Sequence, residues 1–283
     1  MKDKRQQEEK LFSPKVSVLI RTYRRPELLR RAIESTERQT YSNIEIVVVE
    51  DGAYEFQPYI QQEVEKNRIK YQCIGTHVGR CLTGNRALEI ASGQYCCFLD
   101  DDDYLYPDHI EVLVRKIQDC TSRMVYSWAE ECEIDSGGCV KRKCVNCAYS
   151  PSRLLLCERN YLPIQSVLFE RSLYDELGGF DSELTALEDW DLWLRYCTKT
   201  TIDYVPKVTS CYHTPFDRAE KQKRVQIMRD AGKMLYERKQ CYVMKMTQSD
   251  IQEEVRYLQS TFNRSFLCRL KRKMFRLFHA VGK

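Results

Sequence analysis

The chain has 283 residues, of which 43% are hydrophobic and 30% charged, and it carries a net charge of +4. This composition is that of a folded globular protein and excludes a disordered or fibrous one. No apolar run approaches the roughly 20 residues that a membrane-spanning helix needs. The first ten residues, MKDKRQQEEK, lack the apolar segment of a signal peptide, so we expect a cytoplasmic location.

Short apolar runs and helical patterns alternate in the first hundred residues. The run VSVLI is rich in β-branched residues and predicts a buried strand, and Pro26 marks the start of the helix that follows. A strand, a helix and a second strand within about 35 residues make a βαβ unit, which indicates an α/β fold with a Rossmann-like sheet flanked by helices. We predict strands at 16–20, 44–51, 68–74 and 95–100 and helices at about 26–39 and 82–91.

The middle of the chain mixes both kinds of element. We expect Asp108 to cap the helix HIEVLVRKI that follows it. Gly137 and Gly138 mark a turn, so residues 125–145 predict a hairpin. The segment LEDWDLWLRYC is typical of a helix start whose acids face a cleft and whose tryptophans anchor it.

The remaining sequence suggests a division into three parts. Residues 1–14 are a polar extension, and residues 15–215 form the main domain. A strand is expected to end near His213, after which the chain reads as helical. Residues 216–283 are therefore predicted to be a helical C-terminal extension with a basic end.

The 14 cysteines have no export signal to accompany them, so we expect no disulfide framework. Cys96, Cys97 and Cys211 lie in apolar runs, where a free thiol packs as a small hydrophobic group. Cys144 and Cys147 leave a zinc site open as an alternative. Their spacing from the other cysteines is not that of a paired zinc motif, and no histidine lies near them.

Four aspartates, Asp100–Asp103, come at the end of the strand predicted at 95–100. Ligands of α/β sheets bind outside the carboxyl ends of the strands, so we expect the aspartates to share a crevice with Thr22, Tyr23 and Asp51, which follow other strand ends. Adjacent carboxylates repel one another and need a countercharge. Oxygen ligands suit Mn²⁺ or Mg²⁺ completed by substrate phosphates. The alternative is a solvated acidic loop.

Three separated segments resemble a known family. They are VSVLIRTYRRPELLRRAIESTERQTYSNIEIVVVEDGA, HVGRCLTGNRALEIASGQYCCFLDDDDYLYPDHI and GGFDSELTALEDWDLWLRY. In this order, over roughly residues 15–215, they resemble the family 2 glycosyltransferases of the GT-A fold. The resemblance implies transfer of a sugar from a nucleotide-sugar with inversion at the anomeric carbon.

The resemblance also implies where the nucleotide-sugar binds. Thr22 and Tyr23 stand where the family's first-strand loop meets the nucleotide, and Asp51 stands where an aspartate meets the base, commonly uracil. The family's D-x-D motif falls on Asp100–Asp102. Asp100 and Asp101 are then nucleotide-sugar-binding residues, and Asp102 is the direct ligand of Mn²⁺ or Mg²⁺.

Two further residues match positions at which the family performs chemistry. Asp189 stands where the family keeps its catalytic base, and a carboxylate there takes the proton of an acceptor hydroxyl. The alternative for Asp189 is an N-cap of the helix DLWLRY. His213 stands where related enzymes place a histidine or arginine near the metal or the diphosphate, and the alternative is a structural histidine.

The sequence departs from the family pattern at two places. The family shows Pro-Thr-Tyr-Asn after its first strand, and this chain has Arg21-Thr22-Tyr23-Arg24. The family shows Asp-Asp-Gly after its second strand, and this chain has Glu50-Asp51-Gly52. Both departures lie at positions where the resemblance puts the nucleotide. They therefore affect the assignment of the nucleotide base more than the assignment of the reaction.

The C-terminal end is strongly basic. Residues 255–283 contain eight lysines and arginines and no acid. On a helical projection, residues 264–280 have one apolar and one basic arc, which is typical of a helix lying on an anionic membrane. A helix packed on the body is the alternative. No nucleic-acid-binding module accompanies the stripe, so we expect no nucleic-acid partner.

The sequence thus predicts a metal-dependent inverting glycosyltransferase, of the hexosyltransferase type, peripheral to the membrane. Its donor is expected to be a UDP-sugar, and its acceptor a saccharide or a lipid-linked glycan of a surface polysaccharide. The alternatives are a sugar nucleotidyltransferase and a non-catalytic nucleotide-sugar-binding scaffold. The first alternative usually has a glycine-rich loop after strand one, and RTYRRPE contains no glycine.

Overall fold

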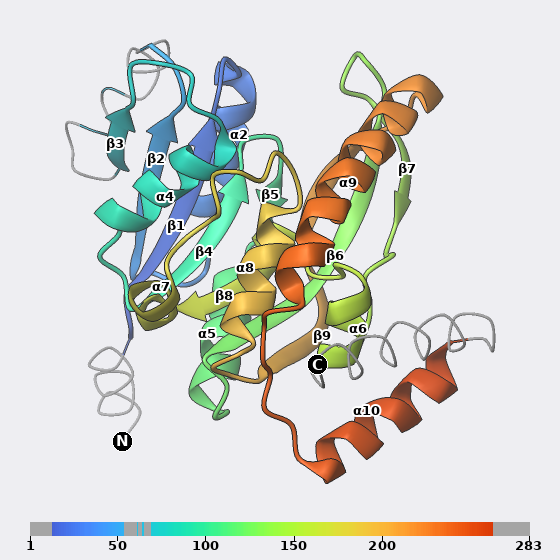
Figure 1. The fold of residues 1–283 in the computed structure, drawn as a ribbon. Helices are drawn as coiled ribbons and strands as arrows, with labels where there is room; N and C mark the ends of the chain where they lie inside the picture. The colour runs from blue at the N-terminus through green and yellow to red at the C-terminus, as the bar shows by residue number, and fades with distance from the viewer. Residues whose placement is uncertain (1–12, 54–60, 62–63, 65–68, 263–283) are drawn as a thin grey trace.

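The computed structural model describes residues 13–53, 61, 64 and 69–262 (Figure 1). The described strands form one sheet of nine strands in the order β3-β2-β1-β4-β8-β6-β9-β5, with β7 beside β6. Helices flank this sheet, and buried apolar clusters lie between them and the strands. This mixed α/β arrangement confirms the predicted fold class.

The half of the sheet that contains the first four strands, β1 to β4, is parallel. All seven residues of its central strand are buried, because helices cover both faces of a parallel sheet. This burial explains the continuous apolar runs of the sequence. The four predicted strands are present, with ends shifted by at most two residues, as β1 (Val16–Thr22), β2 (Ile44–Glu50), β3 (Ile69–Cys73) and β4 (Tyr95–Asp100).

The other half of the sheet is mixed. β8 (Val167–Glu170) runs antiparallel to β4 and to β6 (Met124–Ile134). β6 runs parallel to β9 (Ile202–Pro215), whose other edge pairs with β5 (Tyr104–Leu105). The predicted hairpin is confirmed, since β7 (Val140–Cys144) pairs antiparallel with β6.

The helices pack on the two faces of the sheet. α2 and α5 contribute to one buried cluster, and α4, α6 and α8 contribute to the other. The helices are α2 (Pro26–Glu37), α4 (Arg80–Ile90), α5 (His109–Gln118), α6 (Arg153–Glu158), α7 (Arg171–Leu177), α8 (Glu188–Tyr196), α9 (Arg218–Lys239) and α10 (Gln248–Thr261), with a 3-10 turn, η1 (Ile164–Ser166).

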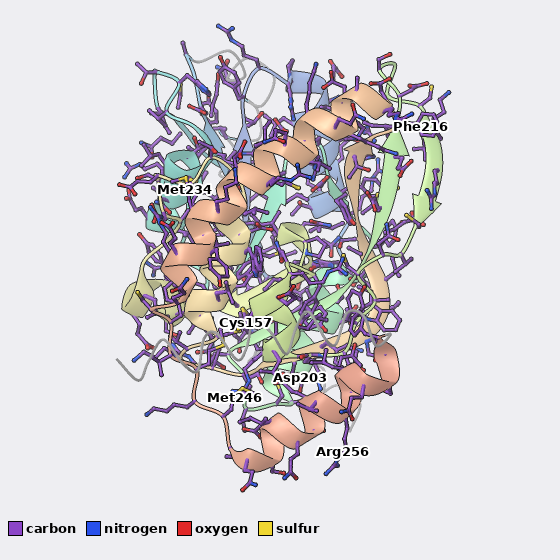
Figure 2. The ribbon with its side chains drawn as sticks, turned by 45° about the vertical axis from the view of Figure 1, so that its right-hand side comes forward. Cys157, Asp203, Phe216, Met234, Met246 and Arg256 are labelled. Carbon is purple, nitrogen blue, oxygen red and sulfur yellow. The ribbon has the colours of Figure 1, made fainter. Side chains whose placement is uncertain are left out.

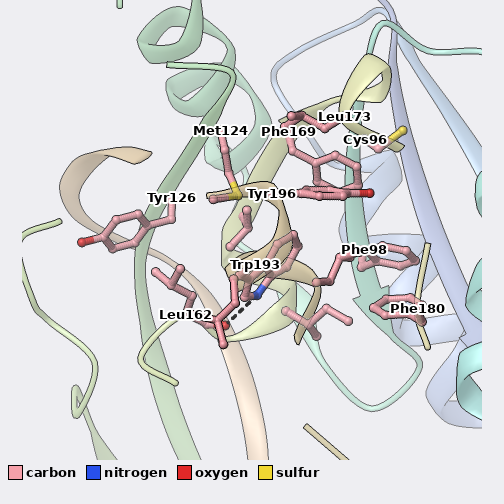
Figure 3. Close-up of a cluster of buried hydrophobic side chains, with 14 of the residues drawn as sticks. Cys96, Phe98, Met124, Tyr126, Leu162, Phe169, Leu173, Phe180, Trp193 and Tyr196 are labelled. Carbon is pink, nitrogen blue, oxygen red and sulfur yellow. Dashed lines mark hydrogen bonds between the residues drawn. The ribbon is translucent and has the colours of Figure 1, made fainter. Parts of the chain in front are cut away.

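Aromatic residues of α8 anchor that helix in the core. Trp193 is fully buried, and its ring lies 5.8 Å from that of Phe169 on β8 (Figure 3). Its Nε1–H donates to the carbonyl of Leu162 at 3.2 Å, so the buried indole keeps a hydrogen-bond partner. Trp190 likewise donates to the carbonyl of Leu156 at 2.6 Å. Both tryptophans therefore anchor α8, as the sequence predicted.

Two polar side chains bind partners within the protein. Asn85 of α4 hydrogen-bonds the backbone of Phe180 through both its amide nitrogen and its oxygen. Asp108 does begin α5, but its side chain caps no backbone N–H. Its carboxylate binds Lys207 of β9 instead, because a full charge attracts the carboxylate more strongly than a neutral N–H does.

The described part of the C-terminal extension contains two helices with a break between them. α9 ends at Lys239 and α10 begins at Gln248 with a capping box formed by Thr247 and Asp250, which starts a separate helix. Figure 2 shows Phe216 before α9 and Met234 on it, and both side chains are exposed. The predicted membrane-surface helix at 264–280 lies outside the described residues. Within the described residues, no helix is both long and apolar enough to cross a bilayer.

Candidate active site

The ends of the parallel strands place polar residues side by side. In the register of the sheet, Arg21 of β1 is paired with Asp100 of β4, and Thr22 is paired with Glu50 of β2. Asp51 follows directly and donates its backbone N–H to the carbonyl of Thr22 at 2.8 Å. The predicted nucleotide and aspartate segments thus meet at one edge of the sheet.

Asp100 has an internal countercharge. Arg21 Nε and Nη2 lie 2.9 and 2.5 Å from Asp100 Oδ1, and the arginine side chain is 5% exposed. Burial raises the pKa of Asp100, but the charges of Arg21 and Arg80 outweigh that effect and lower it. Asp100 is therefore ionised and committed to a protein partner.

Asp101 and Asp102 share a second arginine. Arg25 Nη1 lies 3.2 Å from Asp101 Oδ1 and 3.0 Å from Asp102 Oδ2. Thr22 also donates to Asp101 at 2.8 Å. Burial raises the pKa of Asp101 to about 6, the charge of Asp102 adds to the rise, and Arg25 opposes it. With 35% of its side chain exposed, Asp102 has the most accessible carboxylate of the four.

Asp103 binds β9. Its carboxylate accepts the backbone N–H of His213 at 3.0 Å. Burial raises the pKa of Asp103 well above its ordinary value, and the charges of Asp102 and Asp100 add to the rise. The fourth aspartate therefore joins the run to β9 rather than offering a free carboxylate.

His213 has a defined tautomer. Its Nδ1 makes a hydrogen bond to the backbone carbonyl of Asp102, and a carbonyl can only accept. Nδ1 therefore carries the proton and Nε2 keeps its lone pair. Burial lowers the pKa of His213, and the carbonyl and charge of Asp102 only partly offset this. A neutral imidazole whose Nδ1–H is held by a backbone carbonyl has the outer hydrogen bond that is typical of a metal-binding histidine.

Asp51 binds the loop that precedes α4. Its two oxygens accept the backbone N–H groups of Val78 at 2.6 Å and Gly79 at 3.0 Å, and His77 Nδ1 lies at 2.9 Å. The ring of His77 stacks on Tyr23, with centroids 4.3 Å apart. Asp51 thus holds residues 77–79 beside Tyr23, and its contact with a base stays a prediction.

Asp189 lies in the first turn of α8. Its Oδ2 accepts from Asn160 Nδ2 at 2.8 Å, and its Oδ1 accepts from the backbone N–H of Trp190 at 2.8 Å. Burial raises its pKa to about 7, and the charge of Glu188 adds to the rise. The N-cap position belongs to Leu187, so the alternative reading of Asp189 as the helix cap is wrong.

One guanidinium joins the aspartate run to α8. While Arg21 binds Asp100, its Nη1 lies 3.1 Å from Glu188 Oε1, and Arg80 lies 3.7 Å from the same oxygen. Glu188 directly precedes Asp189 in the chain. The segments at 100–103 and 188–189, far apart in sequence, are therefore within reach of a single side chain.

Comparison with known proteins identifies the family. The sequence pattern of glycosyl transferase family 2 matches residues 17–177, which is more than half of the chain. The chain belongs to glycosyl transferase family 2. This family 2 glycosyltransferase is 33% identical over 126 residues to the putative glycosyltransferase EpsH of Bacillus subtilis, a match that covers 44% of this chain and 36% of EpsH. It is 32% identical over 190 residues to the putative colanic acid biosynthesis glycosyl transferase WcaA of Escherichia coli, covering 65% of this chain and 66% of WcaA.

Solved structures share the fold of this glycosyltransferase. Staphylococcus aureus TarS 1–349 in complex with UDP superposes with a TM-score of 0.63 at 17% identity, covering 89% of this chain and 73% of that one. The mannosyltransferase PcManGT from Pyrobaculum calidifontis, in complex with GDP-Man and Mn²⁺, gives a TM-score of 0.63 at 17% identity, covering 87% and 69%. At this identity the likeness concerns the fold, which confirms the GT-A expectation.

Arg21, Arg25 and Glu188 belong to the candidate site of this glycosyltransferase by their contacts, and they are not among the site residues predicted from the sequence. Their signal was present, because four adjacent carboxylates require cations and RTYRRPE supplies several. In the sequence, Arg21 stands out only because it replaces the family's proline. Backbone strain is a second signal available only from the structure. Arg24 and Leu187, both with φ near +60°, are the described non-glycine residues with positive φ, and each lies beside the site.

The cysteine pair of this glycosyltransferase has no metal-site geometry. Among the described residues, the group whose ligand atoms lie close enough to hold an ion is Glu130, Cys132 and Cys211. The thiol of Cys144 instead contacts the carboxylate of Glu131 at 3.7 Å. A zinc site at Cys144 and Cys147 therefore gains no support.

Proposed function

We propose that this glycosyltransferase transfers a hexosyl group, with inversion, from a nucleotide-diphospho-sugar to a hydroxyl group of a saccharide or lipid-linked acceptor. The observation that carries the proposal is the contact of Arg21 with both Asp100 and Glu188. This contact supports a single site that contains both the aspartate run and Asp189, which follows Glu188 in the chain. A donor-binding group and a proton acceptor must be that close for a sugar to pass between them.

Asp189 is the proposed base. A sugar hydroxyl is a poor nucleophile, and a carboxylate within hydrogen-bond reach takes its proton as attack proceeds. A pKa of about 7 suits this role, because a base is most effective when its pKa is near the working pH. Asn160 fixes one oxygen of Asp189, which leaves the carboxylate a defined orientation.

A divalent cation fits the aspartate run, with Asp102 and His213 as its proposed ligands. Asp102 is the most accessible carboxylate of the run, and His213 keeps a lone pair on Nε2. A mixed oxygen and imidazole set suits Mn²⁺, and Mg²⁺ is the other candidate. When bound, the cation offsets the negative charge that develops on the departing diphosphate. The Mn²⁺ complex of PcManGT supports this choice.

The donor is proposed to be a UDP-sugar. Asp51 and the stacked rings of Tyr23 and His77 form a wall at the expected base position. The structural relatives carry UDP in one case and GDP-Man in the other. Thr22 precedes Tyr23 in the chain and donates a hydrogen bond to Asp101, which precedes Asp102, so we expect the diphosphate near this pair.

The acceptor is proposed to belong to a surface polysaccharide. WcaA, named for colanic acid biosynthesis, supports this assignment. The predicted helix at 264–280 would hold the enzyme at the inner face of an anionic membrane, near a lipid-linked glycan. Membership of the glycosyltransferase family displaces the nucleotidyltransferase alternative. The scaffold alternative is left to experiment.

The first experiment is a thermal shift of the purified protein with UDP, GDP, TDP or CMP, each with and without Mn²⁺. A ligand that binds only the folded state raises the melting temperature by mass action. We expect a rise with UDP that depends on Mn²⁺. A rise with another nucleotide would reassign the donor. No rise with any of them would contradict the proposed donor site and favour the scaffold.

A further inference from the structure

Arg21 is the buried cation at the centre of the site. Its side chain is 5% exposed, and that of Glu188 is 4% exposed. The guanidinium lies 5.3 Å from the ring centre of Phe180, so an aromatic face covers it on one side. Its Nη1 binds Glu188 while Nε and Nη2 bind Asp100, which fixes the planar group from two directions.

This arrangement keeps Arg21 charged. Burial lowers the pKa of the guanidinium, but Asp100 and Glu188 together more than offset burial and raise it. Removing one member of a buried ion pair leaves the other charge uncompensated, which costs much more than losing an exposed pair. The position of Glu188, and with it the first turn of α8, is therefore tied to β1.

The charges of Arg21 and Glu188 act electrostatically on Asp189, because Glu188 directly precedes Asp189 in the chain. On its own helix, the charge of Glu188 raises the pKa of Asp189; from β1, Arg21 lowers it. From α4, Arg80 approaches Glu188 to 3.7 Å. From the loop after α6, Asn160 donates a neutral hydrogen bond to Asp189. The balance between one acid and one buried arginine thus acts on the proposed base.

We propose that Arg21 and Glu188 form an internal charge pair that positions Asp189 and sets its charge state. Arg21 is then a positioning residue for the transfer reaction, although it reaches the base only through Glu188. This inference rests on the proposed function for its catalytic meaning. The electrostatic coupling between Arg21, Glu188 and Asp189 can be measured in the protein without any substrate.

Two variants change the pair in opposite directions. Glu188→Gln removes the neighbouring negative charge and leaves Arg21 with Asp100 alone, so the pKa of Asp189 falls. Arg21→Met removes the buried positive charge and leaves Glu188 with only the more distant Arg80, so the pKa of Asp189 rises. We expect shifts of about one pH unit, the order of magnitude that a single nearby charge produces. The double variant should return toward the wild type, since the two changes oppose each other.

The matched control is Asp191→Asn. Asp191 is a buried acid on the same helix, and it is paired with Arg195 at 2.8 Å and with Tyr242 at 2.6 Å. Its replacement perturbs α8 to a similar extent without touching Arg21 or Glu188. A purely structural role for the pair predicts that Glu188→Gln and Asp191→Asn act alike.

The measurement is a pH titration of aspartate labelled with ¹³C at the carboxyl group, with the Asp189 signal assigned by its absence in Asp189→Asn. The acid limb of kcat/KM against pH is the second readout. An Asp189 pKa that is unchanged in Glu188→Gln, or shifted equally in Asp191→Asn, would overturn the inference. If Arg21→Met does not fold, the Asp189 pKa measured in Glu188→Gln and in Asp191→Asn tests the inference on its own. If the wild type transfers no sugar, the proposed function fails while the titration still tests the coupling.

Discussion

His213 donates its Nδ1–H to the backbone carbonyl of Asp102, and its own backbone N–H is accepted by Asp103. Two residues separated by more than a hundred positions are thereby locked together at the junction of β9 and the aspartate run. The bond leaves Nε2 of His213 as an acceptor beside an accessible carboxylate. This geometry carries the first two predictions.

Replacing His213 by Ala should weaken Mn²⁺ binding by about tenfold to a hundredfold, because an imidazole ligand and its oriented hydrogen bond are lost together. Isothermal titration of Mn²⁺ into the protein with UDP present measures the change. His77→Ala is the control, since His77 is exposed and lies at the nucleotide wall. Equal Mn²⁺ affinity in His213→Ala and wild type would show that His213 is structural.

Asp102→Ala should abolish the Mn²⁺-dependent part of UDP binding. The cation loses its most accessible carboxylate, while Arg25 keeps Asp101 as a partner. Asp108→Ala is the matched control, an acid a few residues along whose partner is Lys207. Thermal shift with UDP and Mn²⁺ makes the comparison. An unchanged affinity of Asp102→Ala for UDP in the presence of Mn²⁺ would contradict the assignment of Asp102 as a metal ligand.

Asp189→Asn should keep donor binding and slow transfer by about 10²–10⁴-fold, the usual contribution of a general base. In the wild type, activity should fall as the pH drops through about 7, because the raised pKa of Asp189 leaves the carboxylate protonated below that value. Donor affinity is checked by UDP titration and transfer by product formation. A variant that loses both equally would point to a folding role instead.

His109 should make the protein less stable in mild acid. It is fully buried against Thr209, and burial lowers its pKa to about 4. Between pH 6.5 and 4 the unfolded chain therefore binds a proton that the folded chain does not, so stability falls as the pH drops through this window. The loss is about 2 kcal/mol at pH 5.

Urea unfolding at pH 7 and pH 5 tests this prediction on the wild type and His109→Gln. The glutamine keeps a polar side chain but does not titrate, so the pH-dependent part of the free energy of unfolding should shrink. An equal pH dependence in both proteins would assign the effect to other groups.

Trp193→Ala should lower the free energy of unfolding by about 3–5 kcal/mol, since it empties a large, fully buried site in the core. Leu82→Ala, at a position that is 45% exposed, is the control and should have little effect. Urea unfolding of both variants gives the comparison. A small effect of Trp193→Ala would mean that the core collapses around the gap.

The sequence was most informative where residues act through local pattern. The runs at β1, β2 and β4 predicted their strands because buried parallel strands are apolar without interruption. The hairpin of β6 and β7 followed from its glycine turn. The helical pattern after Phe216 did not show that the extension is divided, because the break between α9 and α10 depends on the capping box at Thr247.

The sequence by itself determined the α/β class, the family and the positions at which chemistry was expected, since strand ends, aspartate spacing and the acids before Trp190 are properties of adjacent residues. Tertiary structure decided which charges meet. Arg21 lies far from both Asp100 and Glu188 in the chain. The register of β1 beside β4 pairs Arg21 with Asp100, and the packing of α8 brings Glu188 to the same guanidinium. Electrostatic energy depends on distance in space, which the order of residues does not give.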